Sequence, residues 1–286
     1  MDQHLMSNNS RNGVQNRETF HKFFESWLVE QNQDLEQLVR ASKEVNGVEE
    51  NNRRMLSPLI QRVIHHYENY YKEKSRSAKE DVLGMLNPTW RSNLEDAFLW
   101  IGGWRPSMAF HLLYSKSGLQ LEAGFHDLFR GISRGDLGDL SGIQLGKIDE
   151  LQNKTLREEK KLTERLAKVQ ETVADTSMVE LSHIVSELMR EEGRQVEETE
   201  EEKVKTNIAK KEEGLLEALK KADDLRLRTL KEILGILKPI QAVHFLIAAA
   251  ELHLRIHDWG MKKDTVAVNS RNHGHGVLNN RDRVRI

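Results

Sequence analysis

Apolar residues recur every three or four positions along most of the chain, which is the spacing that places them on one face of an α-helix. Residues 143–174 form the longest such stretch. At about 1.5 Å per residue this helix would extend roughly 48 Å and would need an antiparallel neighbour, for which residues 176–190 are a candidate. The same spacing predicts further helices over about 19–42, 53–86, 90–101, 106–114, 119–132, 176–190, 212–237 and 240–259. Strand-type alternation is absent, so the pattern predicts an all-α fold: a single elongated helical bundle of about eight helices, including long antiparallel helices.

Prolines and glycines mark where the predicted helices end. Pro88 closes the second helix, and Pro239 interrupts the apolar pattern near the C-terminus because proline cannot donate a hydrogen bond inside a helix. Gly102 and Gly103 end the short helix before them, since glycine tolerates the left-handed backbone found at helix C-termini. These positions divide the chain into several separate helices rather than one continuous helix.

Polar stretches divide the chain into a helical domain and two tails. Residues 1–17 are rich in Asn, Ser and Gln and are expected to be disordered. The domain spans 18–260, and residues 261–286 are expected to form a disordered basic tail. Inside the domain, residues 190–211 are dense in charge and almost free of apolar side chains, so we expect a solvated linker or a frayed helix there.

Composition narrows the class of protein. The 286 residues include 31% charged residues and no cysteine, and the formal net charge is −2. The lack of cysteine excludes disulfides, thiolate catalysis and cysteine-based zinc sites. The lack of a basic surplus gives no sign of direct binding to duplex nucleic acid. The longest apolar run, 242–250, is far too short to cross a bilayer, so no membrane association is expected.

The sequence contains no catalytic motif. It lacks a nucleophile elbow, a zincin motif, a phosphate loop and a dinucleotide fingerprint. Its carboxylates, such as Glu158 and Glu159, occupy helical positions that suit salt bridges with neighbouring basic residues. The sequence therefore predicts a protein that is not an enzyme and holds no metal.

Three blocks of sequence resemble one plant family. They are FFESWLVEQ at 23–31, WRSNLEDAFLWIGGWRPS at 90–107, and ADDLRLRTL at 222–230 followed by LHLRIHDWG at 252–260. Together they are similar to the DOG1-type domain of the Delay-of-Germination proteins, which is shared with the C-terminal domain of TGA bZIP transcription factors. The resemblance covers about 18–260, and its most specific part is FLWIGGWRPS.

The resemblance implies a regulatory protein that acts through partners. It implies a role in seed dormancy or maturation and in abscisic-acid signalling, by binding type 2C protein phosphatases, with a location in the nucleus and cytoplasm. A transcriptional co-regulator that works with bZIP or TGA-type partners is an alternative. The basic region and zipper of TGA factors have no counterpart in residues 1–17, so no sequence-specific DNA binding by the chain alone is expected. Long apolar helices favour self-association, and the resemblance to this family implies it as well.

The first block supplies a candidate partner-binding segment. Its aromatic density is high, so one face of the helix can pack inward while the other docks a partner. In Delay-of-Germination proteins the matching segment is implicated in phosphatase binding. The alternative is a helix packed fully into its own bundle. The candidate residues are Phe24, Glu25, Ser26, Trp27, Leu28 and Val29.

The second block supplies a candidate pocket around Trp100, Trp104 and Arg105. Tryptophan buries a large area and is enriched at binding interfaces. The competing interpretation is core packing around a helix–turn–helix, with Arg105 paired to Glu95 or Asp96.

The third block contains His253 and His257, which are four residues apart and share one helical face. Family members are reported to bind haem, and this pattern resembles the implicated site. Axial ligands of a six-coordinate haem lie on opposite sides of the porphyrin, so two residues on one helical face cannot both ligate one iron. One histidine would ligate while the other orients it, or a second ligand would come from elsewhere. The alternative is two polar histidines near a helix C-terminus.

Overall fold

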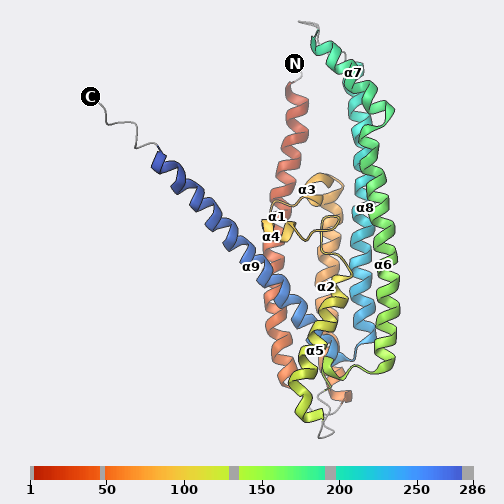
Figure 1. Ribbon diagram of the computed structural model, residues 1–286, viewed down its shortest axis with the longest axis vertical. Coiled ribbons are helices and arrows are strands. Elements are labelled where there is room, and N and C mark those ends of the chain that lie inside the picture. Colours follow the sequence, from red (N-terminus) through yellow and green to blue (C-terminus); the bar gives the residue numbers. More distant parts are fainter. Residues whose placement is uncertain (1–2, 46–48, 129–134, 191–197, 279–286) are drawn as a thin grey trace, which may run out of the picture.

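The computed structural model describes residues 3–45, 49–128, 135–190 and 198–278, and these residues form helices joined by short turns (Figure 1). No β-strand occurs among them, so the predicted all-α fold of about eight helices is confirmed. The α-helices are α1 (Gln3–Lys43), α2 (Glu49–Ala78), α3 (Val82–Leu86), α4 (Asn93–Asp96), α5 (Met108–Leu128), α6 (Gly142–Glu171), α7 (Thr176–Arg190), α8 (Glu198–Ile236) and α9 (Pro239–Leu278). Two 3₁₀ turns, η1 (Leu137–Asp139) and η2 (Thr172–Ala174), lie on either side of α6.

The bundle is elongated, and its long helices run side by side (Figure 1). The helices α6 and α8 form an antiparallel pair, so the long 143–174 helix has the antiparallel neighbour that its length requires, but this neighbour is α8 and not the predicted 176–190. On the other side, α9 crosses α1 and α2. Because α2 packs against both α8 and α9, it joins the two parts of the bundle.

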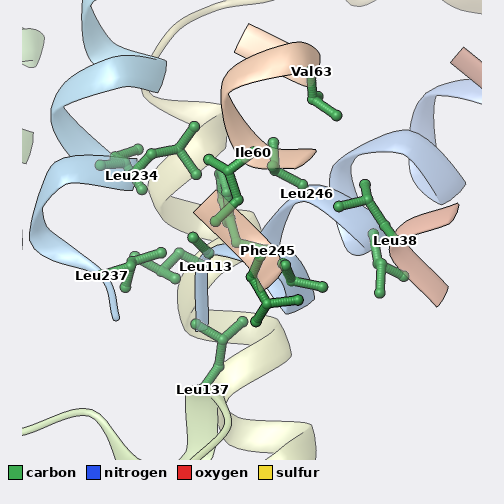
Figure 2. Close-up of a cluster of buried hydrophobic side chains, with 14 of the residues drawn as sticks. Leu38, Ile60, Val63, Leu113, Leu137, Leu234, Leu237, Phe245 and Leu246 are labelled. Atoms are coloured by element: carbon green, nitrogen blue, oxygen red, sulfur yellow. The ribbon is translucent and has the colours of Figure 1, made fainter. Parts of the chain in front are cut away.

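One core lies at the end of the bundle where α5 and η1 meet the start of α9 (Figure 2). Leu113 and Phe245 are 0% and 1% exposed at its centre. Apolar side chains from seven elements make up this core, which explains why the N-terminal half of α9 is apolar on most faces. Residues labelled in this core include Leu38, Ile60, Val63, Leu137, Leu234, Leu237 and Leu246.

A second core is rich in aromatic side chains and lies nearer the start of α1 and the end of α2. Phe20 packs against Trp90 at 4.8 Å between ring centroids, and Trp27 packs against Tyr70 at 5.0 Å. Leu219, with neighbouring apolar residues of α8, closes this cluster from the other side. The aromatic residues of the first sequence block therefore form a core.

Helix continues into segments for which the sequence predicts irregular structure. The helix α1 begins at Gln3 rather than near residue 19, and Arg17 ties this part to the loop before α3 through its Nη2, 3.2 Å from Asp81 Oδ1. The helix α9 continues to Leu278 and runs away from the bundle after it crosses α1 (Figure 1).

The charged segment 190–211 also contains helix, because α8 begins at Glu198. Pairs three residues apart, such as Lys205 Nζ with Glu202 Oε1 at 3.0 Å, suit a helix that is exposed on most sides. Lys211 reaches Asp175 at the turn before α7. Residues 191–197, and the tail beyond Leu278, lie outside the described residues, so the predicted domain boundaries stay a prediction.

Three of the short predicted helices differ from the structure. The prediction of a helix over 90–101 is wrong, since only Asn93–Asp96 are helical. The two helices predicted over 106–114 and 119–132 form one helix, α5, up to Leu128. A Cβ on Gly118 of α5 would meet no neighbouring atom within 4 Å, so this glycine neither breaks the helix nor makes a close contact.

Candidate functional site

A tight turn after α4 organises the site. Trp100 N donates to Gly103 O at 2.7 Å, and Gly103 N donates back to Trp100 O at 3.2 Å. Between them, Ile101 and Gly102 have φ values of 46° and 64°. A Cβ on Gly102 would lie 2.6 Å from the carbonyl oxygen of Met85, so only glycine fits. This reversal explains why the predicted helix over 90–101 stops early.

Arg226 of α8 stabilises this turn by donating hydrogen bonds to its backbone carbonyl oxygens. Its Nε donates to Trp104 O at 2.6 Å and its Nη2 donates to Ile101 O at 3.0 Å. The guanidinium also contacts Trp100 O and the Asp223 carboxylate. The fork of guanidinium donors therefore satisfies several carbonyls that point inward, and it joins the second sequence block to the third.

Lys74 of α2 completes the polar network under the turn. It is 2% exposed, and its Nζ donates to Gly102 O at 2.8 Å and to Asp223 Oδ1 at 2.9 Å. Burial lowers the pKa of Lys74 to about 7, against the opposing effect of Asp223. Lys74 and Arg226 thus bind backbone carbonyls of the turn and Asp223 pairs with both cations, which is a structural role.

Trp100 belongs to the core rather than to a pocket. It is 7% exposed, and its Nε1 donates to Thr163 Oγ1 at 2.9 Å. The guanidinium carbons of Arg105 and Arg226 lie 5.5 and 5.4 Å from its ring centroid. Arg105 therefore contacts the Trp100 ring, where the sequence suggests a pair with a carboxylate of α4.

A cavity of about 670 Å³ lies beside the turn, between α1, α2, α5, α8 and α9. Aromatic and aliphatic side chains make most of its wall. Trp27, Trp104, Arg105 and His253 all line it, so residues from all three sequence blocks meet at one place. The predicted pocket residues Trp104 and Arg105 are thus brought together with one of the two predicted histidines.

Several polar atoms of the cavity wall lack a partner. Trp104 Nε1, His253 Nε2 and two guanidinium nitrogens of Arg91, Nε and Nη1, are buried and make no hydrogen bond to any described residue. Arg91 Nη2 reaches Tyr70 Oη at 3.3 Å. Buried polar groups are nearly always hydrogen-bonded. These atoms are therefore unsatisfied polar groups of residues that line the cavity.

The two histidines of α9 have different surroundings. His253 Nδ1 lies 3.0 Å from Gln31 Oε1, and an amide oxygen only accepts, so Nδ1 carries the proton and Nε2 presents a lone pair. Burial lowers the pKa of His253 to about 4, so the ring is neutral at pH 7. His257 Nδ1 instead lies 2.9 Å from Glu95 Oε2, and its ring meets Phe24 edge-on. Of these two histidines, only His253 lines the cavity.

The donor set of the cavity fits a haem. Neutral His253, with Nδ1 held by Gln31 and Nε2 unbonded, is an imidazole that would bind a haem iron. Aromatic walls suit a porphyrin, and the basic side chains of Arg91 and Arg105 suit its carboxylates. The cavity volume is within the range of about 300–1,000 Å³ that is usual for such sites. Among the described residues, no group of three or more His, Asp or Glu could hold a metal ion by itself.

The predicted partner-binding segment of α1 is divided between core and surface. Phe24 and Trp27 are 1% and 3% exposed, and Trp27 Nε1 donates to His66 O at 3.3 Å. Leu28 packs against the same core. These two aromatic side chains fill the second core, so they are buried away from the outer face of α1. The remaining three residues, Glu25, Ser26 and Val29, are exposed.

Sequence reasoning missed several residues that build the site. Glu159, expected in a surface salt bridge, is 2% exposed and accepts from Ser107 N at 2.6 Å and from Ser107 Oγ at 3.1 Å at the start of α5. The sequence pattern also does not mark Gln31 and Arg91 as site residues, although both lie inside the family blocks. A charged or amide residue within an otherwise apolar block is the signal that could have found them.

Comparison with known proteins identifies the family. The family described as "DOG1: Seed dormancy control" matches residues 31–115. Protein DOG1-like 4 of Arabidopsis thaliana is 33% identical over 251 residues, which cover 87% of this chain and 95% of that protein. The chain belongs to the DOG1-like family. The resemblance carried by the three blocks is therefore confirmed.

Two further relatives of this DOG1-like chain bear on its role. Protein RESPONSE TO ABA AND SALT 1 of Arabidopsis thaliana is 28% identical, with 84% of this chain and 94% of that protein covered. Transcription factor TGA2.3 of Oryza sativa is 28% identical, with 80% of this chain but only 60% of the factor covered.

Within the part of the chain that the structure describes, no helix is long and apolar enough to cross a membrane.

Proposed function

We propose that this DOG1-like chain is a non-enzymatic regulatory protein that acts by protein–protein interaction in seed dormancy or maturation and in abscisic-acid signalling. Membership of a family described by seed dormancy control, and a relative named for its response to ABA, support this role. The buried charges of the chain also support it. Lys74, Arg226 and Glu159 bind backbone atoms, as residues that stabilise a scaffold do.

The partner we propose is a type 2C protein phosphatase that binds the outer face of α1. The observation that carries this is the division of α1: Phe24 and Trp27 fix the helix in the core, while Val29 is 60% exposed between polar neighbours. An anchored helix loses little conformational freedom on binding, so its exposed face is preorganised for a partner. Glu25 and Ser26 provide polar contacts at the same face.

A pull-down with type 2C phosphatases tests the proposal. Val29→Glu should reduce binding by about tenfold, because a charge replaces an apolar contact. Val173→Glu is the matched control, since Val173 is 63% exposed on η2 and should bind like the wild type. Trp27→Ala is a poor test because it would open a hole in the core. Absence of phosphatase binding by the wild-type chain, or equal loss in both variants, would reject the proposal.

A haem-binding sensor is a second candidate, favoured by the unbonded Nε2 of His253 in the cavity wall. His253 would bind the iron, Gln31 would orient the imidazole, and Arg91 with Arg105 would hold the carboxylates. Bound haem would supply an iron that responds to redox state or to small gaseous ligands. His253→Ala should abolish a Soret band that survives desalting, whereas His257→Ala should retain it. A band unchanged in His253→Ala would reject this site.

Similarity to TGA2.3 supports a third candidate function, a transcriptional co-regulator that associates with bZIP partners. In this role some molecules are in the nucleus and others in the cytoplasm. Gel shifts on TGA-type sites test it. The purified chain alone should leave the DNA unshifted and should add to a shift produced by a TGA factor. Tight, sequence-selective binding by the chain alone would contradict this view.

A further inference from the structure

A basic groove of about 730 Å³ runs between α6 and α8, on elements other than the proposed phosphatase surface. Its lining contains a single carboxylate, Glu164. The basic residues that line it are Lys161, Arg165, Lys168, Lys210, Lys211 and Lys221. In a chain whose formal net charge is −2, this is a local concentration of positive charge.

Half of these basic residues have acidic partners and half do not. Lys221 Nζ lies 2.8 Å from Glu217 Oε1, which Arg165 also approaches through the other oxygen. Lys211 contacts Asp175. In contrast, Lys161, Lys168 and Lys210 form no ion pair with any residue in the described parts of the chain.

The floor of the groove is apolar. Leu162 and Val169 of α6 form it, and Gly214 of α8 lies opposite Val169. A Cβ at Gly214 would come within 3.1 Å of both methyl groups of Val169. The glycine therefore lets α6 and α8 approach closely and places no side chain over Val169. An apolar floor between basic edges is complementary to a helix that is apolar on one face and acidic on both flanks.

The groove suits such a helix better than a nucleic acid. None of its lining residues is aromatic, so it offers no surface on which bases could stack. Glu164 and Glu217 also lie among the cations, where they would repel a continuous phosphate backbone.

We propose that the α6–α8 groove binds an acidic amphipathic helix of a partner protein. The apolar face of this helix lies on Leu162 and Val169, and its acidic flanks pair with Lys161, Lys168 and Lys210. The partner adds a helix along the α6–α8 pair. Charges at the edges of an interface act mainly on association rate and salt dependence, while the apolar floor limits dissociation.

Fluorescence anisotropy with the full chain tests this. The probe is a labelled helical peptide with a leucine stripe flanked by glutamates, and two matched peptides carry Glu→Gln or Leu→Ser changes. The groove variant carries K161E, K168E and K210E. The control variant carries K72E, K79E and K147E, which are exposed lysines elsewhere, so that both variants have the same net charge. Circular dichroism confirms that each is folded.

The acidic leucine peptide should bind the wild type and the control, and the groove variant should lose about tenfold or more in affinity. Both altered peptides should bind more weakly than the parent peptide. Absence of peptide binding, equal loss in the two variants, or indifference to the leucine stripe would overturn the proposal. Binding of a single-stranded RNA through the same lysines, as tightly as the peptide, would also overturn it.

Discussion

His257 Nδ1 lies 2.9 Å from Glu95 Oε2, so a histidine of α9 holds the one fully buried acid of the short helix α4. The same carboxylate oxygen accepts from Ser92 N at 2.9 Å and from Ser92 Oγ at 2.8 Å, which completes a capping box. This cluster fixes the start of α4 against α9. It also gives His257 a structural role that the spacing of the two histidines does not reveal.

Loss of the Glu95 charge should destabilise the protein in acid. Burial favours the neutral acid, but hydrogen bonds from His257 and Ser92 lower the pKa of Glu95 to about 2. The charged form therefore contributes roughly 3 kcal/mol to the free energy of unfolding, present above about pH 4.5 and lost as the pH falls towards 2. Denaturant unfolding between pH 2 and 6 should show this slope in the wild type and a flatter one in Glu95→Gln. The exposed change Glu164→Gln should leave the slope as in the wild type.

His253 should produce a separate acid transition at higher pH. Burial lowers the pKa of His253 to about 4, so between about pH 6.5 and 4 the unfolded chain binds a proton that the folded chain does not. The free energy of unfolding should fall by roughly 2–3 kcal/mol over this window as the pH drops. His253→Gln should remove most of that fall. Its persistence in the variant would show that another group is responsible.

Periodicity alone predicts the parts of the long helices whose apolar faces are continuous, but it misses the polar extensions of α1, α8 and α9. The pattern over 143–174 matches α6 at Gly142–Glu171 within a few residues. It fails over 90–101, where the backbone at Ile101 adopts a positive φ that Arg226 stabilises from 125 residues away. Such a contact between distant residues leaves no trace in local spacing.

The sequence predicts which residues belong to the candidate site, but it does not predict how they are arranged in space. The three blocks contain Trp104, Arg105 and His253, yet nothing in their spacing shows that these residues line one cavity. Aromatic density in the first block suggests a docking face, whereas Trp27 is used in the core. Which face of a helix turns inward depends on the helices that cross it.

Arg226 should be essential for the turn that organises the site. Arg226→Ala removes a buried guanidinium and leaves Asp223 and the carbonyls of Trp100 and Trp104 without this donor. We expect a loss of about 3–5 kcal/mol in the free energy of unfolding, measured by denaturant titration. Arg228→Ala is the control, because its side chain is 46% exposed and pairs with Glu158 at the surface. Similar losses in both variants would contradict the role assigned to Arg226.

Gly260 should be required for the close approach of α9 to α4. A Cβ at this position would lie 2.0 Å from Ser92 Oγ and 2.6 Å from Ser92 Cβ, so Gly260→Ala must push the capping serine away from Glu95. We expect the free energy of unfolding to fall by about 1–3 kcal/mol, the usual cost of overpacking. The matched control is Gly235→Ala in α8, where an added Cβ meets nothing within 4 Å. Because alanine favours helix more than glycine does, this control should gain about 0.5–1 kcal/mol. Thermal and denaturant unfolding of the two variants should therefore shift in opposite directions, and a gain in Gly260→Ala would show that α4 does not pack against α9 in this way.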